Sequence, residues 1–182
     1  MDHPINPAQP VTAFRIRTAA PADVPALMRL KRLLAEAEDS LHAVRAGTAD
    51  WLRDGFGAHP GFTAYVAEVG SAVVGMATCS RRTITGWNGP ILFLQDLFVE
   101  AVHRRCGVAE ALMARVAALA HELGSPIVEL TVRADNNPAQ LFYQRAGFQP
   151  LPQCLTYVLA GPALDALAGR DRARDEPLAL AG

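Results

Sequence analysis

The stretch from Gln95 to Ala109 constrains the fold of this chain more than any other part of the sequence. A nearly all-apolar run over 91–100 leads into a short basic turn, and an Ala- and Leu-rich run over 108–123 follows. The first run predicts a strand buried on both faces and the second predicts a helix. The first turn of such a helix presents free N–H groups at the positive end of the helix dipole. The sequence therefore predicts a site for an anionic group, such as a pyrophosphate, around Gly107.

The elements around this unit predict a mixed α/β chain with one central sheet. Further strands are expected over 14–18, 62–69, 72–82, 126–133 and 155–159. Helices are expected from Pro21 to about Ser40, from Thr48 to about Gly55, from Asn137 to Gly147 and over 161–168. The helical crossover makes the strand over 126–133 parallel to that over 91–100.

A single domain is expected over 14–168, because 182 residues suffice for one well-buried core. The Pro-rich segment 1–13 predicts a flexible N-terminal arm, and residues 169–182 predict a disordered C-terminal tail.

Charge and cysteine usage narrow the class of protein. Seventeen basic and 18 acidic residues give a net charge of -1, which disfavours nucleic acid and anionic membranes as partners. No apolar run reaches the roughly 20 residues that a membrane span needs, and no signal-peptide pattern opens the chain. The three cysteines are far apart and the five histidines are scattered, so neither a disulfide framework nor a metal site is expected. We interpret the chain as cytoplasmic.

The basic turn contains chemistry that suits a phosphate. Arg104 and Arg105 carry forked guanidinium donors, and Gly107 lets the backbone approach a ligand closely. Taken alone, such a short glycine motif more often belongs to an ordinary surface loop.

A second segment, D-N-N-P-A-Q-L-F-Y-Q-R-A-G-F over 135–148, changes that interpretation. Helical spacing places Ala139, Phe142 and Tyr143 on one face. Aromatic residues at this spacing more often fill a core than form a site, when they are considered alone.

Together the two segments resemble the GCN5-related N-acetyltransferase (GNAT) superfamily. Its first motif, Arg-x-x-Gly-x-Gly/Ala, is matched by Arg104, Gly107 and Ala109. Its second is matched by Asn136, Ala139, Tyr143, Gly147 and Phe148. The resemblance covers about residues 14–160. It implies the GNAT fold, in which four or so helices flank a single mixed sheet of about six to seven strands.

The resemblance implies acetyl-coenzyme A as co-substrate and direct transfer to a primary amine, without a metal. Backbone N–H groups over 104–109 would hold the pyrophosphate, one near Phe98 or Val99 would polarise the thioester carbonyl, and Tyr143 would protonate the leaving thiolate. The residues implied for the coenzyme are Leu97, Phe98, Val99, Arg104, Arg105, Cys106, Gly107, Val108, Ala109, Asn136, Ala139, Phe142, Tyr143 and Arg145.

Within the superfamily the chain resembles the spermidine/spermine (diamine and thialysine) N-acetyltransferase branch. The segments that carry this resemblance are D-G-F-G-A-H-P at 54–60, V-A-E-V at 66–69, F-L-Q-D-L-F-V at 93–99, and Trp87. That branch carries Glu where this chain has Gln95, so diamines, polyamines, thialysine and related amino acids are all candidate acceptors. Members commonly form homodimers, and residues 155–159 are a candidate contact strand.

An amine acceptor needs help to lose a proton, because its neutral form at pH 7 costs about 4.6 kcal/mol. Asp96 is the first candidate for a catalytic base, and Glu38, Trp87 and Gln95 are candidates for the substrate side by resemblance. Alternatively, Asp96 makes a structural hydrogen bond and Glu38 is simply solvated. Simple alternation places Gln95 and Asp96 on opposite faces of the strand, so both reach one site only if a bulge redirects one of them.

Two further functions stay open at this stage. One is acetylation of a protein or peptide amine. The other is a non-catalytic sensor that binds coenzyme A, which is suggested by Gln95 in place of the acid.

Overall fold

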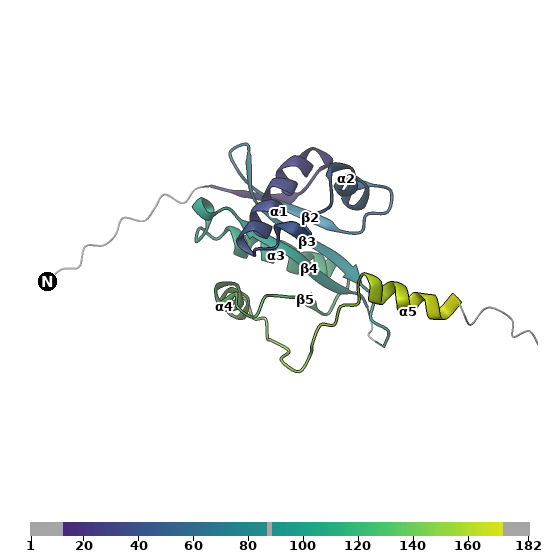
Figure 1. The fold of residues 1–182 in the computed structure, drawn as a ribbon. Helices are drawn as coiled ribbons and strands as arrows, with labels where there is room; N and C mark the ends of the chain where they lie inside the picture. Colours follow the sequence, from purple (N-terminus) through teal and green to yellow (C-terminus); the bar gives the residue numbers. More distant parts are fainter. Residues whose placement is uncertain (1–12, 87–88, 173–182) are drawn as a thin grey trace, which may run out of the picture. The chain divides into compact units, whose positions relative to one another are not determined.

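The computed structural model describes residues 13–86 and 89–172 (Figure 1). The chain divides into two compact units, Met1–Gln140 and Leu141–Gly182. The first contains the whole sheet, and the second contains the C-terminal part of one helix and a further helix. The expected arm over 1–13 and tail over 169–182 lie mostly outside the described residues and stay predictions.

The sheet is mixed, as predicted, and its five strands follow chain order from β1 to β5. The first four strands pair antiparallel, and β5 pairs parallel to β4 after the crossover. The strands are β1 (Arg15–Thr18), β2 (Thr63–Val69), β3 (Ala72–Arg82), β4 (Ile91–Val99) and β5 (Val128–Leu130).

The strand count is lower than the expected six to seven, and residues 155–159 form no strand. A strand forms only where another strand supplies hydrogen-bond partners. The described part of the second unit contains no strand to do so, and Leu155, Tyr157 and Val158 are highly exposed.

Five α-helices are present in the described residues, one at each segment where the sequence predicts a helix and one more than the four or so that the resemblance implies. Short 3-10 turns also occur at η1 (Pro21–Asp23), η2 (Leu41–Ala43) and η3 (Ala101–His103). The helices are α1 (Val24–Ala37), α2 (Thr48–Phe56), α3 (Val108–Glu122), α4 (Asn137–Arg145) and α5 (Pro162–Arg172).

In the first unit, α1 and α3 cover opposite faces of the sheet (Figure 1). Successive residues of β2 show this division, because strand side chains alternate between faces. Val66 belongs to the buried cluster that contains Leu27 and Leu30 of α1, whereas Tyr65 lies under the guanidinium of Arg115 on α3.

A buried ionic network ties the start of α1 to the sheet. The guanidinium of Arg17 on β1 donates to both oxygens of Asp23, at 2.6 and 2.7 Å, and to Glu68 on β2 at 2.5 Å. Asp23 also accepts the backbone N–H of Ala20 at 2.7 Å. The hydrogen bonds from Arg17 hold the pKa of the Asp23 carboxyl below its ordinary value.

Asp23→Asn should therefore lower the free energy of unfolding by about 2 kcal/mol at pH 7, since it removes a charged hydrogen-bond acceptor. A depressed carboxyl pKa stabilises the fold above the unfolded-state pKa of about 3.9, and this stabilisation disappears as pH falls through the lower folded-state value. Urea unfolding between pH 2.5 and 7 measures both effects. Glu122→Gln is the matched control, because its pair with Arg115 is exposed and contributes little. Equal changes in the two variants would contradict the assignment.

Candidate active site

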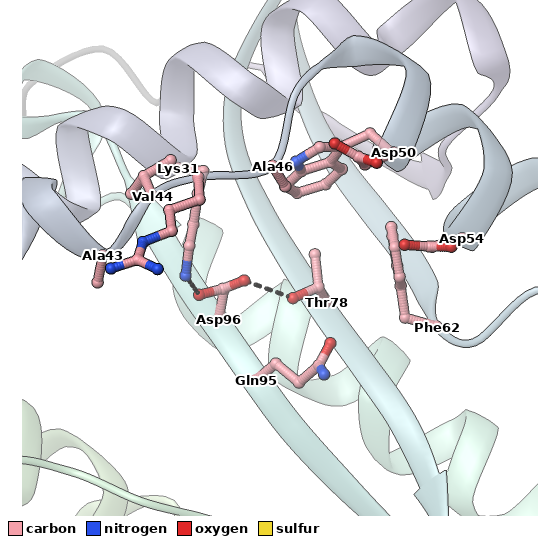
Figure 2. A pocket seen from close by; sticks show the side chains of 12 residues that line it. Lys31, Ala43, Val44, Ala46, Asp50, Asp54, Phe62, Thr78, Gln95 and Asp96 are labelled. Atoms are coloured by element: carbon pink, nitrogen blue, oxygen red, sulfur yellow. Dashed lines mark hydrogen bonds and ion pairs between the residues drawn. The ribbon is translucent and has the colours of Figure 1, made fainter. Parts of the chain in front are cut away.

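Strand β4 contains the bulge on which the predicted site depended. Thr78 of β3 pairs with Asp96 and Cys79 pairs with Leu94, so Gln95 has no partner in this ladder. The extra residue redirects one side chain. Gln95 and Asp96 accordingly line the same pocket (Figure 2).

The pocket has a volume of about 310 Å³ and lies where α1, the loop before α2, and α2 meet β3 and β4. Its lining mixes apolar surface with charged side chains of both signs, three carboxylates against two cations. The residues that line it are Lys31, Ala43, Val44, Arg45, Ala46, Asp50, Trp51, Asp54, Phe62, Thr78, Gln95 and Asp96.

Asp96 is almost completely buried and each of its oxygens accepts a hydrogen bond. Lys31 Nζ lies 2.5 Å from Oδ1, and Thr78 Oγ1 lies 2.8 Å from Oδ2 (Figure 2). These partners compensate the cost of burying the charge. The expected carboxylate of β4 is thus present, together with an ammonium partner from α1.

Two further carboxylates come from α2, one helical turn apart. Asp50 accepts the backbone N–H of Gly47 at 2.8 Å and a hydrogen bond from Arg53, and both lower its pKa. Arg53 also lowers the pKa of Asp54. Both carboxylates therefore keep their charge at neutral pH, and their ion pairs with Arg53 offset part of the negative charge on this side of the pocket.

The segment D-G-F-G over 54–57 has a packing role beside the pocket. Trp51 and Phe62 form an edge-to-face pair with ring centroids 5.3 Å apart, and both line the pocket. A Cβ on Gly55 would lie 2.6 Å from the Phe62 ring, and one on Gly57 would lie 2.4 Å from the carbonyl oxygen of Arg53. Gly55 thus allows the Phe62 ring to pack against α2, and Gly57 allows the chain to pass close to the last turn of that helix.

The basic turn has the backbone geometry expected of an anion site. Arg105 and Gly107 both have positive φ, at 60° and 81°, and Gly107 is the N-cap of α3. A Cβ built on Gly107 meets nothing within 4 Å, so the space beside this N-cap residue is open. Those residues fit a phosphate group.

The side chain of Arg104 contacts the end of β4. Its Nε donates to the carbonyl oxygen of Val99 at 2.9 Å, and its guanidinium lies 5.5 Å from the ring centroid of Phe98. Arg104 thereby fixes the turn to the end of the strand. The Cys106 thiol contacts the carbonyl oxygen of Arg104 at 3.4 Å within the same turn.

One edge of β4 is released from pairing where the bulge occurs. β5 pairs with β4 through Leu92, Phe93 and Leu94 and no further in the described residues, whereas β3 pairs along the strand to Val99. The backbone over 95–99 therefore has an edge without a strand partner. A strand edge of this kind binds extended ligands through main-chain hydrogen bonds.

The start of α4 belongs to the first unit, and Asn136 has a structural role there. Its Oδ1 accepts the backbone N–H of Ala139 at 3.2 Å, so Asn136 caps the helix. We expected the cap at Asn137, one residue later. Gln140 Nε2 also donates to the carbonyl oxygens of Arg133 and Ala134, which fixes the helix start after β5.

The second unit holds Tyr143 in a defined helix end. The N–H of Phe148 donates to the carbonyl oxygen of Tyr143 and that of Gly147 to Gln144, both at 3.0 Å. With Gly147 at φ 96°, this is a Schellman motif. The ring of Tyr143 also contacts those of Phe142 and Phe148, at centroid distances of 5.4 and 5.7 Å.

Three predicted residues lie elsewhere or are not described. Glu38 caps the C-terminus of α1 and is not among the pocket residues. Arg145 ends α4 and is exposed. Trp87 lies outside the described residues. Conversely, sequence reasoning missed Lys31, Arg45 and Thr78, since no local motif marks them.

Two negative observations apply to residues 13–86 and 89–172. No group of three or more His, Cys, Asp or Glu side chains there is arranged to hold a metal ion. No helix in this part of the chain is long and apolar enough to cross a membrane.

The family model "Acetyltransferase (GNAT) family" matches residues 25–148. Thialysine N-epsilon-acetyltransferase of Mus musculus is 33% identical over 171 residues, which cover 88% of this chain and 100% of that protein. Spermidine/spermine N(1)-acetyltransferase-like protein 1 of Homo sapiens is 35% identical over 114 residues, 59% of this chain but only 16% of that longer protein. The chain belongs to the GNAT acetyltransferase family and is an acetyl-coenzyme A-dependent N-acetyltransferase.

Solved structures share the fold. An integron cassette protein from V. cholerae superposes with a TM-score of 0.71 at 21% identity, covering 85% of this chain and 97% of that one. An aminoglycoside N-acetyltransferase solved with CoA superposes with a TM-score of 0.67 at 20% identity, covering 86% and 100%. The predicted GNAT fold is therefore confirmed.

Gly107→Ala should weaken coenzyme A binding at least about tenfold, because the new Cβ enters the space in front of the helix N-terminus. Isothermal titration calorimetry with coenzyme A measures the change in Kd. Gly70→Ala is the matched control, since Gly70 also has positive φ and open space around its Cβ position but lies in the β2–β3 turn. An unchanged Kd in Gly107→Ala would remove the turn from the coenzyme site.

Proposed function

We propose that this chain acetylates a primary amine of a small cationic molecule, and that the pocket beside the β4 bulge binds this acceptor. The observation that carries the proposal is the cluster of three carboxylates, Asp50, Asp54 and Asp96, around one pocket. An ammonium group is attracted to such a lining. The same strand offers an unpaired edge for an extended ligand.

Acetyl-coenzyme A supplies the acetyl group as a thioester. The N–H groups that start α3 at Gly107 bind its pyrophosphate, and Arg105 adds positive charge at the turn. An N–H of β4 near Phe98 or Val99 polarises the thioester carbonyl. The sequence motif, the open space at Gly107 and the released edge of β4 support this arrangement.

Asp96 faces the reacting amine. An ammonium held on this carboxylate lies next to a group that accepts its proton, and the neutral amine then attacks the carbonyl carbon. A carbon–nitrogen bond forms, the carbon–sulfur bond breaks, and the sulfur leaves as thiolate, while the amide nitrogen releases its second proton to solvent. By the motif resemblance, Tyr143 would donate a proton to that sulfur and regain one from solvent, Asn136 would contact the pantetheine arm, and Arg145 would contact a coenzyme phosphate.

Diamines, polyamines and thialysine-like amino acids are the proposed acceptors. Relatives named for thialysine and for spermidine/spermine support this class. Arg45 supports the amino acids in particular, because its guanidinium lines the same pocket as the acids and suits a substrate carboxylate.

We also propose a homodimer and a cytoplasmic location. The exposed apolar run Leu155–Leu159 supports the dimer, because apolar patches of this kind commonly mark protein contacts. Sedimentation velocity tests the oligomeric state directly.

An acceptor panel tests the proposed activity. The chain is incubated with acetyl-coenzyme A and diamines, polyamines, thialysine, lysine or a lysine-containing peptide, and free thiol is followed. Thiol release with one or more small amines is expected. Release only with the peptide would favour a protein acetyltransferase. Tight coenzyme A binding without release from any acceptor would favour a sensor, as Gln95 in place of an acid suggested.

Tyr143→Phe should lower kcat at least about tenfold with little change in coenzyme A affinity, because it removes only the hydroxyl proton donor. Steady-state kinetics with the best acceptor from the panel measure kcat, and calorimetry measures affinity. Tyr157→Phe is the control, since Tyr157 is a highly exposed tyrosine of the same unit. Equal kcat values in the two variants would exclude Tyr143 from the chemistry.

A further inference from the structure

Lys31 is the sole lysine of the sequence, in which every other side chain of the Lys and Arg class is an arginine. It belongs to α1, and its side chain lies in the pocket beside the β4 bulge. The chain therefore places its one side-chain primary amine inside the pocket that we assign to a primary amine acceptor. Lys31 thus differs from the arginines of the chain, whose side chains end in guanidinium groups rather than in a primary amine.

The ammonium of Lys31 also resembles an acceptor in its contacts. It lies 2.5 Å from Oδ1 of Asp96 and is carried on a flexible chain of four methylene groups, as each amine of a four-carbon diamine is. Thr78 occupies the other oxygen of Asp96 at 2.8 Å. An acceptor ammonium that binds Asp96 must compete for the same oxygen.

The Lys31 ammonium can contact solvent or other groups when it leaves Asp96. One third of its side chain is exposed, whereas that of Asp96 is 9% exposed. Asp50 and Asp54 line the same pocket and keep their negative charge. A long, flexible side chain loses little when it exchanges one carboxylate for solvent and nearby acids.

We propose that Lys31 is an internal competitor of the acceptor amine: its ammonium holds the position on Asp96 that an acceptor ammonium takes, and acceptor binding displaces it. This inference rests on the proposed acceptor pocket. Lys31 sets the affinity for the acceptor and is not a catalytic residue. It lowers the apparent affinity for every acceptor ammonium by the same factor, because each must displace it from Asp96.

Competition of this kind has a calculable effect. The apparent affinity for a ligand falls by the fraction of molecules in which its position is accessible. If Lys31 holds Asp96 in about nine molecules of ten, then removing its charge lowers the acceptor KM about tenfold.

Steady-state kinetics of the full chain with a diamine and a monoamine test this effect. Lys31→Met should lower the acceptor KM about tenfold with a smaller change in kcat, for the diamine and the monoamine alike. Arg32→Met is the matched control, because it removes one exposed charge from the same helix and should leave the KM unchanged. A KM for Lys31→Met that equals or exceeds that of the parent overturns the proposal.

The sole lysine also allows a direct measurement of its displacement. Reductive methylation with ¹³C-formaldehyde keeps the positive charge and labels one side chain besides the N-terminal amine. The lysine NMR signal should shift as a diamine is added, and Asp96→Asn should remove most of this shift. No shift at a diamine concentration that calorimetry shows to be saturating overturns the proposal.

The two hypotheses fail in distinguishable ways. If no amine of the panel releases thiol while diamine binding still moves the lysine signal, the proposed activity fails and the competition stands. If amines release thiol but neither the KM of Lys31→Met nor the lysine signal changes as described, the activity stands and the competition fails.

Discussion

The unpaired residue Gln95 in β4 is the constraint on which the arrangement of the site depends. Up to Leu94 the strand pairs with β5, and beyond the bulge Asp96 lies opposite Thr78. The extra residue lets the adjacent side chains of Gln95 and Asp96 line one pocket, and it lies where the pairing with β5 ends. Side chains of β4 can then line the pocket while the unpaired backbone edge of the same strand binds an extended ligand.

Burying Asp96 next to that bulge requires partners, since an isolated buried carboxylate is very unfavourable. Lys31 and Thr78 provide them, and the Lys31 contact joins α1 to β4. The same requirement makes the site responsive to ligands. A carboxylate whose cation is one-third exposed can exchange it for another cation at much lower cost than a fully enclosed pair.

Local patterns in the sequence were sufficient for β4, α3 and the short glycine-containing turn between them, because each depends on neighbouring residues. The need for a bulge also followed from Gln95 and Asp96 being adjacent. The Lys31–Asp96 contact joins residues 65 positions apart, and no local pattern encodes it. Residues 155–159 have the composition of a strand, but composition does not indicate whether a partner strand is available.

The two motifs identified by resemblance contain residues that are proposed to bind the coenzyme and residues that hold the local backbone and side chains in place. Gly147 and Phe148 close α4 with a Schellman motif, and the ring of Phe148 contacts that of Tyr143, so the motif helps to orient the tyrosine side chain. Gly55 similarly gives Phe62 space beside Trp51. Substitutions at these supporting positions should thus act through the aromatic side chains that they hold. The hydrogen bonds and close contacts around each motif residue therefore show which members of a motif hold the others in place.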